Sequence, residues 1–293
     1  MSNALQIRSR RRLASVHRAE VSRRTAGIAA AEVTGHRALQ DEFAQLRREH
    51  NDLQRSLFEA AQVQRRMCGP RLQRWAPFAV ATEIFPVRHL SGDFLSVFEA
   101  DGKVVFAIGD IAGKGLPAGM WFTHLISLVR LRFAEEREPA ATMAAVNCDL
   151  MNGGTASPLA TVFLGEFNPK SGEATYCNAG HPPAALLRAS GAIEQLRSGG
   201  PVLGALAGTA FLNGKATLEP GDTLLGYSDG ITECRNAGGE EFGAEKLLDA
   251  ARAARHAGAA ATLFSVLGAV EDFAGDYPRE DDLALIVVHR NAD

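Results

Sequence analysis

The sequence lacks a framework of cysteines. Its four cysteines, Cys68, Cys148, Cys177 and Cys234, are scattered, and no C-x-x-C spacing occurs. Such isolated cysteines indicate small buried side chains in a reducing compartment, and not a disulfide or zinc framework. The eight histidines are also dispersed, with no H-E-x-x-H pair. A histidine-based metal site is therefore not indicated.

Long apolar runs are absent as well. No segment reaches the roughly 18 apolar residues that a transmembrane helix needs, and the N-terminus lacks the apolar stretch of a secretory signal. We therefore expect a cytoplasmic protein without membrane insertion. The contents of 46% hydrophobic and 22% charged residues are ordinary for a soluble globular protein. The net charge of −3 does not indicate nucleic acid as a general partner.

Positive charge is concentrated at the N-terminus. Residues 1–24 contain one acidic residue, Glu20, and seven arginines. One interpretation is contact with an anionic partner or a membrane surface. The other is a frayed basic tail, which we expect because chain termini are commonly disordered.

Residues 30–66 predict one long helix, because they contain no proline and only one glycine, Gly35. From Leu39 onward, spacings of four and three residues alternate, as in a coiled-coil seam. The seam consists of Leu39, Phe43, Leu46, His50, Leu53, Leu57, Ala60 and Gln64. We expect a parallel homodimer through this seam. The alternative is a single amphipathic helix that packs on its own domain. Gly69-Pro70 predicts the end of the helix.

The most informative stretch is residues 104–117, V-V-F-A-I-G-D-I-A-G-K-G-L-P. Its first five residues form a short apolar run that is typical of a buried strand. Glycines follow at 109, 113 and 115, and Pro117 suits the first turn of a helix. Asp110 thus lies at the mouth of a strand, in a loop whose glycines allow close approach to a ligand. A plain β-turn is the alternative interpretation.

An acidic residue borders an apolar strand at four places. Asp93 opens one strand, Asp110 and Asp229 each follow one, and the pair Asp281-Asp282 opens the last. Carboxylates gathered from distant parts of a chain repel one another unless cations lie between them. Mg²⁺ and Mn²⁺ prefer such oxygen ligands. The pattern therefore predicts a two-metal hydrolytic site.

Five motifs, in order, resemble those of metal-dependent PPM-type serine/threonine protein phosphatases. They are S-G-D-F (91–94), G-D-I-A-G-K-G-L-P-A-G-M (109–120), N-A-G-H-P-P (178–183), S-D-G-I-T-E (228–233) and D-D-L-A-L-I-V-V (281–288). The most similar branch is the bacterial one typified by the sporulation stage II E phosphatase and by regulators of anti-sigma-factor antagonists. The resemblance covers the chain from Phe78 to Arg290.

The order of the expected elements predicts an α+β fold. Strands are expected at 78–85, 94–99, 103–108, 160–167, 173–178, 184–188, 192–196, 210–218, 222–227 and 283–289. Helices are expected at 116–136, 140–151, 244–254 and 259–274. This order fits two stacked antiparallel sheets flanked by helix pairs, and the resemblance implies the same α-β-β-α sandwich. We divide the chain into a basic tail with a coiled-coil helix (1–75) and a phosphatase domain (76–293).

The resemblance also implies the roles of the acidic residues. Asp110 would bridge two Mn²⁺ or Mg²⁺ ions, and the Ile111 carbonyl would reach the second ion. Asp229 and Asp281 would complete the shell of the first ion, while Asp93 would lie on the side of the second. A metal-bridged hydroxide would then attack phosphorus without a covalent enzyme intermediate, with Asp110 and Asp229 as the catalytic residues. The absence of G-x-S-x-G and C-x₅-R motifs agrees with this chemistry.

Some positions stay open. Asp282 competes with Asp281, because neighbouring residues in a strand point to opposite faces. His181 could contact phosphate or could be a histidine fixed by loop hydrogen bonds. Lys114 could meet the substrate phosphate or could be a solvated surface residue.

Two positions depart from the family pattern. Ser96 replaces a second acid, and Ala284 replaces a threonine or serine. These changes could weaken the order of the groups around the metal ligands.

We therefore expect a metal-dependent phosphatase that acts on phosphoserine or phosphothreonine of a signalling protein. The resemblance implies an anti-sigma-factor antagonist as the substrate, and an activator protein could bind the N-terminal helix. One alternative is a catalytically weak or inactive adaptor of the same fold. Another is a helical module whose basic N-terminus binds nucleic acid.

Overall fold

The computed structural model describes the backbone of residues 2–153 and 157–292. Within these ranges, it describes side chains at 18, at 21–24 and from 39 onward. The chain divides into two compact units, residues 1–56 and 57–293. The last turns of the long helix, from residue 57, fold with the second unit. The expected domain boundary between residues 75 and 76 stays a prediction.

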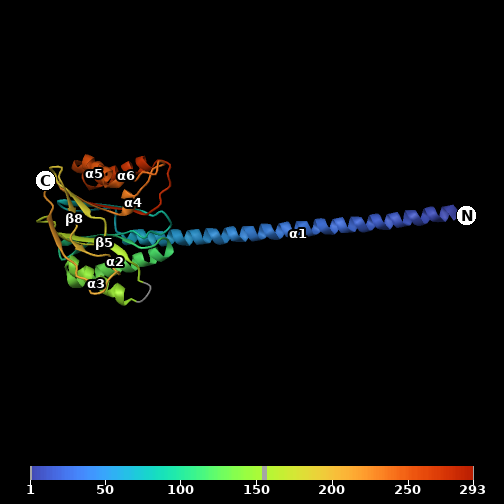
Figure 1. Cartoon of the computed structure of the whole chain (residues 1–293), viewed down its shortest axis with the longest axis horizontal. Helices are drawn as coiled ribbons and strands as arrows, with labels where there is room; N and C mark the ends of the chain where they lie inside the picture. The colour runs from blue at the N-terminus through green and yellow to red at the C-terminus, as the bar shows by residue number, and fades with distance from the viewer. Residues whose placement is uncertain (1, 154–156, 293) are drawn as a thin grey trace. The chain divides into compact units, whose positions relative to one another are not determined.

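Helix α1 (Ser2–Met67) is continuous (Figure 1). The arginine-rich N-terminus is therefore helical, and the expectation of a frayed tail is wrong for the backbone. The reason lies in the composition, because residues 2–67 contain no proline and only two glycines, Gly27 and Gly35. Alanine, arginine, leucine and glutamine dominate the segment, and these residues favour helix.

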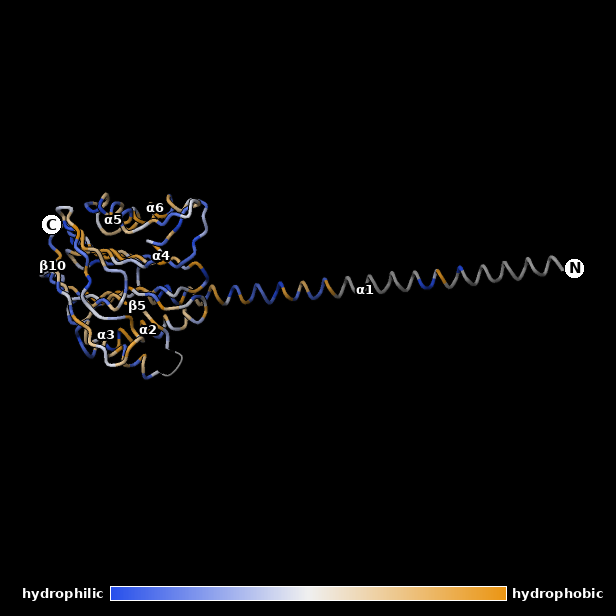
Figure 2. The backbone as a smooth tube through the Cα atoms, viewed as in Figure 1, coloured by the Kyte–Doolittle hydropathy of each residue, from blue (hydrophilic) through white to orange (hydrophobic). Residues whose placement is uncertain are grey.

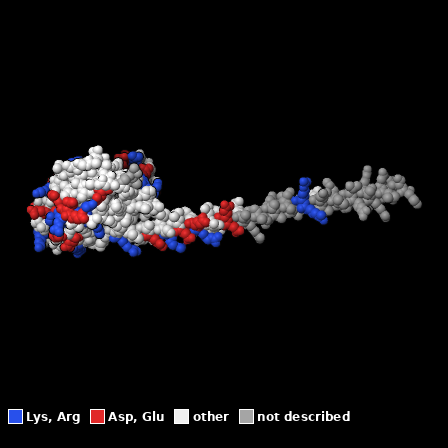
Figure 3. Space-filling model, turned by 90° about the horizontal axis from the view of Figure 1, so that it is seen from below, with Lys and Arg blue, Asp and Glu red and all other residues white. Residues whose placement is uncertain are grey.

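The first part of the expected seam is exposed to solvent. The exposed fractions are 70% for Leu39, 61% for Phe43, 63% for Leu46 and 58% for Leu53. Acidic and basic side chains are interspersed along the described part of the helix (Figure 3). Gln64, by contrast, is 7% exposed. The alternative of a helix packed on its own domain thus describes the last turns, while Leu39, Phe43, Leu46 and Leu53 stay exposed to solvent.

The second unit is a sandwich of two sheets, and the predicted fold class is confirmed. One sheet has the order β1 (Leu72–Trp75), β2 (Phe78–Phe85), β12 (Leu283–Arg290), β11 (Thr223–Tyr227), β7 (Ala184–Leu187), β8 (Ile193–Leu196). The other has the order β10 (Gly214–Thr217), β6 (Glu173–Ala179), β5 (Ala160–Phe167), β4 (Lys103–Ile111), β3 (Phe94–Ala100). Neighbouring strands are antiparallel, except that β9 (Gly199–Gly200) pairs with β6 in parallel.

Helix pairs cover the outer faces of the sandwich. Helices α2 (Leu116–Glu136) and α3 (Pro139–Asn152) lie on one side, and α5 (Gly243–Ala254) and α6 (Ala259–Ala274) lie on the other (Figure 1). Two short helices, α4 (Asp229–Thr232) and η1 (Arg255–Ala257), complete the unit. No helix that the structure describes carries an apolar stretch sufficient to span a bilayer.

Apolar side chains hold the layers together, and hydrophobic residues gather in the strands (Figure 2). Phe78 of β2 packs on Phe167 of β5, with ring centroids 4.6 Å apart. This contact joins the two sheets. Below α5 and α6 lies a second cluster, which contains Leu225, Val266 and Leu285. The burial of such side chains is the main stabilising contribution to the fold.

Several elements differ from the expected ones. The strand expected at 210–218 is reduced to β10, because the Phe211 ring packs over Gly200 and Asn213 Oδ1 accepts a hydrogen bond from the Ala140 amide at the start of α3. These contacts draw residues 211–213 away from the ladder. Strand β4 extends to Ile111, so that Asp110 lies within the strand and not beyond it. The short elements β1, β9 and α4 were not expected.

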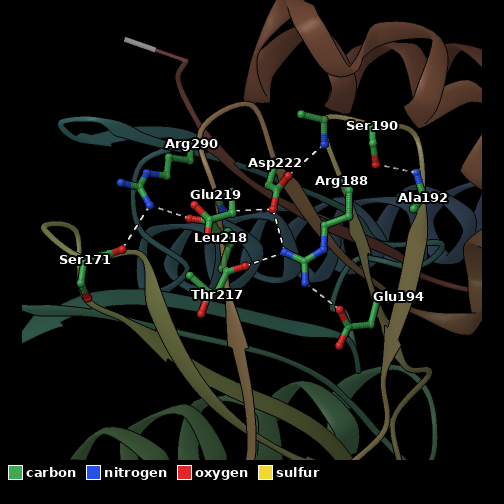
Figure 4. Close-up of polar contacts among 11 residues, drawn as sticks. Ser171, Arg188, Ser190, Ala192, Glu194, Thr217, Leu218, Glu219, Asp222 and Arg290 are labelled. Atoms are coloured by element: carbon green, nitrogen blue, oxygen red, sulfur yellow. Dashed lines mark hydrogen bonds and ion pairs between the residues drawn. The ribbon is translucent and has the colours of Figure 1, made fainter.

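Two arginines tie the sheets together at the end of β12 that is remote from Asp281 (Figure 4). The Arg188 guanidinium donates to the Thr217 carbonyl at 2.6 Å and to Asp222 Oδ2 at 2.8 Å. Arg290, at the end of β12, donates to the Leu218 carbonyl at 2.7 Å. Because both arginines belong to the first sheet and residues 217–218 end a strand of the second, these bonds close the sandwich.

Candidate active site

Four chain segments bring the predicted acidic residues to the same edge of the sandwich. Asp93 precedes β3, Asp110 lies near the end of β4, Asp229 opens α4 after β11, and Asp281 precedes β12. Strand β3 pairs with β4, and β11 pairs with β12. Each sheet therefore contributes two of these carboxylates. The structure thus brings together all four acids that the sequence singled out.

The acidic side chains raise one another's pKa. Asp93 is 2% exposed, and its burial, together with the Asp110 charge, raises its pKa well above the usual range. Burial and the neighbouring Asp229 and Asp281 raise the pKa of Asp110 to about 6. Burial and Asp281 also raise the pKa of Asp229. A cation among these carboxylates would relieve the repulsion.

The oxygen atoms around Gly92 form a cradle. A Cβ atom added to Gly92 would lie 3.2 Å from the Ile111 carbonyl oxygen, 3.3 Å from the Gly113 carbonyl oxygen and 3.4 Å from Asp110 Oδ1. Next to this cradle, Asp93 Oδ2 is buried and has no hydrogen-bond partner among the described residues. Hard divalent ions take carboxylate and carbonyl oxygens, so these residues fit Mg²⁺ or Mn²⁺.

The side chains alone do not complete such a site. Within residues 39–153 and 157–292, no three His, Cys, Asp or Glu side chains converge closely enough to hold one ion. A ligand set at this edge would therefore include backbone carbonyls, such as that of Ile111, and water molecules. Mg²⁺ in particular usually keeps several waters.

The glycines at the end of β4 and in the loop that follows have different reasons to be glycine. Gly113 and Gly115 have φ angles of 114° and 77°, which side chains disfavour. A Cβ atom on Gly109 would overlap the Thr161 carbonyl and the Phe94 ring. Gly115 is the N-cap of α2, and Pro117 lies in the first turn of that helix, as the sequence predicted.

Asp281 and Asp282 have separate surroundings. Asp282 Oδ1 accepts a hydrogen bond from the Val87 amide at 2.7 Å. Its Oδ2 accepts bonds from the Gly92 amide at 2.8 Å and the Ser91 hydroxyl at 3.0 Å. Both oxygens of Asp282 thus anchor the loop before Asp93. Asp281 makes none of these bonds: its Oδ1 accepts from the Asp282 amide at 3.0 Å and its Oδ2 from Lys114 Nζ at 2.8 Å. Because its side chain does not anchor that loop, Asp281 is favoured as the candidate ligand of the pair.

Gly230 allows Asp229 to approach Asp281. A Cβ atom on Gly230 would overlap the Asp282 carbonyl oxygen and would lie 3.3 Å from the Asp281 Cβ. Any larger residue would push α4 away from the start of β12. The close packing explains why glycine follows the acid at this position.

The two departures from the family pattern have local partners. Ser96 Oγ accepts a hydrogen bond from Arg130 Nε at 3.0 Å. The Ala284 backbone amide donates to Ser228 Oγ at 2.9 Å, and its carbonyl accepts from the Ser228 amide at 3.0 Å. The Ala284 backbone therefore holds the start of α4 although the side chain offers no hydroxyl.

His181 is fixed by its own loop. Its Nδ1 lies 2.9 Å from Thr161 Oγ1, its amide donates to Asn178 Oδ1 at 2.8 Å, and its carbonyl accepts from Asn178 Nδ2 at 2.9 Å. Burial lowers the pKa of His181 to about 3. Of the two interpretations left open by the sequence, a neutral histidine held by loop hydrogen bonds fits this geometry.

Two cations lie at the glycine loop that follows Asp110. Lys114 Nζ donates to Asp281 Oδ2 at 2.8 Å and to the Glu280 carbonyl at 2.9 Å. Arg88 is exposed, and a Cβ atom on Gly115 would lie 3.6 Å from its Nη1. Arg88 belongs to none of the five motifs. The available signal was a single arginine in the loop that leads to S-G-D-F.

Known proteins of similar sequence include a cyanobacterial protein and a bacterial phosphatase. The chain is 31% identical over 209 residues to Protein IcfG of Synechocystis sp. (strain ATCC 27184 / PCC 6803 / Kazusa), a match that covers 61% of this chain and 32% of IcfG. It therefore spans about a third of that relative. It is 25% identical over 259 residues to phosphoserine phosphatase RsbU of Bacillus subtilis (strain 168), covering 87% of this chain and 76% of RsbU.

Solved structures share the fold. The SiaA-PP2C domain of Pseudomonas aeruginosa has a TM-score of 0.70 at 16% identity, covering 82% of this chain and 98% of that domain. The catalytic domain of the phosphatase PstP, in complex with two manganese ions, has a TM-score of 0.51 at 16% identity, covering 72% of this chain and 97% of that domain. The family model described as Stage II sporulation protein E (SpoIIE) matches residues 100–291. Because this match spans more than half of the chain, the chain belongs to the SpoIIE family.

Proposed function

We propose that the chain hydrolyses phosphoserine or phosphothreonine on a protein substrate with the help of two Mg²⁺ or Mn²⁺ ions. The observation that carries this proposal is the buried, unpartnered Asp93 Oδ2 beside the oxygen cradle around Gly92. The name of RsbU, a phosphoserine phosphatase, and the two manganese ions of PstP support the same chemistry.

Acidic side chains and one backbone carbonyl would bind the metal ions. Asp110, Asp229, Asp281 and the Ile111 carbonyl would hold the ions, with Asp93 on the side of the second. Such ions activate water and offset charge on the phosphoryl group. The Gly113 carbonyl and Asp110 Oδ1 both face Gly92, at 3.3 and 3.4 Å from a Cβ built there.

Arg88 is our candidate for the phosphate contact. A Cβ atom on Gly115 would lie 3.6 Å from its Nη1, and Arg88 makes no ion pair within the described part of the chain. A planar guanidinium matches phosphate oxygens in a bidentate manner. It would orient the phosphoryl group over the site.

We propose a phosphorylated anti-sigma-factor antagonist as the substrate. The proposal rests on the resemblance of the five motifs to the sporulation stage II E branch and on the similarity to RsbU. A panel of phosphorylated signalling proteins, compared by kcat/KM, would test it. Equal rates on all of them would contradict this substrate assignment while leaving the phosphatase activity intact.

We also propose that the exposed seam of α1 forms a homodimer and that an activator protein acts on this helix. The exposed apolar residues Leu39, Phe43, Leu46 and Leu53 recur at coiled-coil spacing. A second copy of the chain would bury them.

A second candidate function is the non-catalytic adaptor. One observation favours it: the Lys114 ammonium is bonded to Asp281, one of the candidate ligands. An adaptor would bind phosphoprotein without hydrolysing it.

The test is phosphate release from a phosphoserine protein with Mn²⁺, Mg²⁺ or chelator. We expect activity with either ion and none with chelator. Asp110→Asn and Asp229→Asn should each lower the rate at least about 100-fold, the scale on which groups that hold a metal act, with an unchanged circular dichroism spectrum. Asp272→Asn, an exposed acid on α6, is the matched control. Activity that survives exhaustive chelation would contradict the metal-dependent mechanism, and binding without turnover would favour the adaptor.

A further inference from the structure

The glycine loop after β4 is tied to the segment before β12 by one side chain. Lys114 Nζ donates to Asp281 Oδ2 at 2.8 Å and to the Glu280 carbonyl at 2.9 Å. Among the acids Asp93, Asp110, Asp229, Asp281 and Asp282, Asp281 alone forms an ion pair within the described residues. The cation thus sits on one specific candidate ligand.

We infer that Lys114 is a positioning residue with two alternative partners: it competes with a divalent ion for Asp281, and once displaced it binds the phosphate of the substrate. This inference rests on the proposed function, because it takes Asp281 as a metal ligand. It assigns to one lysine both a limit on metal affinity and a part in substrate binding.

Competition follows from charge and geometry. Lys114 occupies the Oδ2 oxygen of Asp281, and an ammonium on a carboxylate repels a divalent ion that approaches the same carboxylate. Asp282 is engaged elsewhere, because three donors from residues 87–92 bond to its two oxygens. Metal binding at Asp281 must therefore displace the lysine or be weakened by it.

Lys114 is free to change partner. Its side chain is 47% exposed, as is that of Asp281, and a lysine has a flexible four-carbon stem. The flanking glycines, Gly113 and Gly115, have positive φ angles and no side chains that would confine it.

The other cations of the cavity beside Asp281 are differently engaged. A cavity of about 160 Å³ beside Asp281 is lined by Lys114, Arg235 and Arg279, among others. Arg235 pairs with Glu241 at 2.9 Å, and Arg279 pairs with Glu271. Lys114 is thus the cation in this cavity whose partner is a candidate metal ligand, and its release would place a free ammonium at the edge of the site.

The experiment measures Mn²⁺ binding to the full chain by isothermal titration calorimetry. Lys114→Gln should bind Mn²⁺ about 10-fold more tightly than the unaltered protein, within the range by which neighbours of metal ligands alter affinity. The KM for a phosphoserine protein should rise about 10-fold, the effect of losing one hydrogen bond to a charged group. Lys170→Gln, an exposed lysine in the turn after β5, removes the same charge and should change neither value.

Two further variants isolate the pair. In an Asp281→Asn background, Lys114→Gln should no longer tighten Mn²⁺ binding, because the carboxylate for which Lys114 and the ion compete is absent. Lys114→Arg keeps the positive charge and should bind Mn²⁺ no more tightly than the unaltered protein. Lys114→Arg can also be measured if the Lys114→Gln protein fails to fold.

The outcomes separate the inference from the proposed function. If the unaltered protein binds no Mn²⁺, both fail. If it binds Mn²⁺ but Lys114→Gln binds it equally or more weakly, the inference is overturned while the metal-dependent function stands. A tighter Mn²⁺ complex with an unchanged KM overturns the phosphate-binding half alone.

Discussion

Asp282 Oδ2 accepts a hydrogen bond from the Gly92 amide at 2.8 Å, although the two residues are 190 positions apart in the sequence. Asp282 precedes a strand of one sheet, and Gly92 lies two residues before a strand of the other. With the additional bonds from Val87 and Ser91, this contact fixes the loop that presents Asp93. Asp282 thus positions a candidate ligand without needing to contact a metal ion itself.

Replacing Asp282 with asparagine should loosen that loop. An asparagine side chain has one acceptor oxygen, and its NH₂ group would face the Ser91 hydroxyl or the backbone amides. We expect a loss of about 1–3 kcal/mol in the free energy of unfolding, the cost of leaving buried donors unpaired. Mn²⁺ affinity should fall about 10–100-fold. Urea unfolding and calorimetric titration measure the two effects.

The control for this variant is Asp272→Asn, which removes an exposed charge on α6. It should leave both quantities unchanged. If Asp282→Asn retained stability but bound no Mn²⁺ at all, Asp282 and not Asp281 would be the direct ligand of the pair.

A methyl group at Gly92 tests the oxygen cradle. The φ angle of Gly92 is not in the left-handed region, so alanine fits its backbone. The added Cβ would nevertheless lie 3.2–3.4 Å from three oxygens that we assign to the site or its loop. We expect Gly92→Ala to fold normally and to bind Mn²⁺ about 10-fold more weakly, within the range of changes next to metal ligands.

Gly268→Ala provides the comparison, because Gly268 lies in α6 and an added Cβ there meets nothing within 4 Å. That variant should stabilise the protein by about 0.5–1 kcal/mol, since alanine favours helix over glycine. Unaltered Mn²⁺ binding by Gly92→Ala would show that the cradle is not a ligand site.

The pH dependence of stability should report on His181. Burial lowers its pKa from 6.5 to about 3. Between these pH values, the unfolded chain therefore binds a proton at His181 and the folded chain does not. Its stabilising contribution is therefore complete above about pH 6.5 and is lost as the pH falls toward 3, at no more than about 1.4 kcal/mol per pH unit. His181→Gln removes this contribution. The urea midpoint of the variant should fall less between pH 7 and pH 4.5 than that of the unaltered protein.

His124→Gln changes an exposed histidine on α2 and should keep the normal pH dependence. Parallel acid profiles for the unaltered protein and His181→Gln would indicate that His181 is accessible to protons, in conflict with its burial.

Hydrophobic periodicity predicted most of the fold because it reflects burial directly. The bounds of β2, β5, α2 and α6 match the expected ones residue for residue. The short strand β1 went unpredicted, because its sequence L-Q-R-W has no apolar run and its pairing depends on β2. Residues 211–213 were misassigned because their contacts with Gly200 and Ala140 are tertiary.

The candidate site was predictable in composition but not in detail. Motifs identified the acids, since Asp93, Asp110 and Asp229 each lie near a strand end with a glycine next to them, and the Asp281-Asp282 pair precedes the last strand. The anchoring bonds of Asp282 and the Lys114–Asp281 pair depend on how two sheets stack, which spacing within a single segment does not encode. Arg88 has no motif signal beyond its loop, and only the fold places it against Gly115.

The last prediction concerns the link between α1 and the site. Gln64, near the end of α1, accepts a hydrogen bond from the Ser91 amide at 3.2 Å, and its Nε2 donates to the carbonyls of Ser91 at 3.3 Å and Gly119 at 3.2 Å. Ser91 in turn donates to Asp282. A continuous set of hydrogen bonds thus joins the helix to the loop before Asp93. We expect the pairing of two copies of α1 to shift this set between two arrangements.

Replacing both Leu46 and Leu53 with aspartate would place like charges in the proposed seam and should separate the dimer. Light scattering should then show a monomer, and turnover per protomer should change with it. Ala44→Asp with Asn51→Asp adds two charges at outer positions of the same helix and should leave both mass and turnover unaltered. A monomeric seam variant with normal turnover, with and without an activator, would show that helix pairing does not influence the site. The hydrogen bonds of Gln64 would then be insensitive to pairing, and the helix would only connect the two copies.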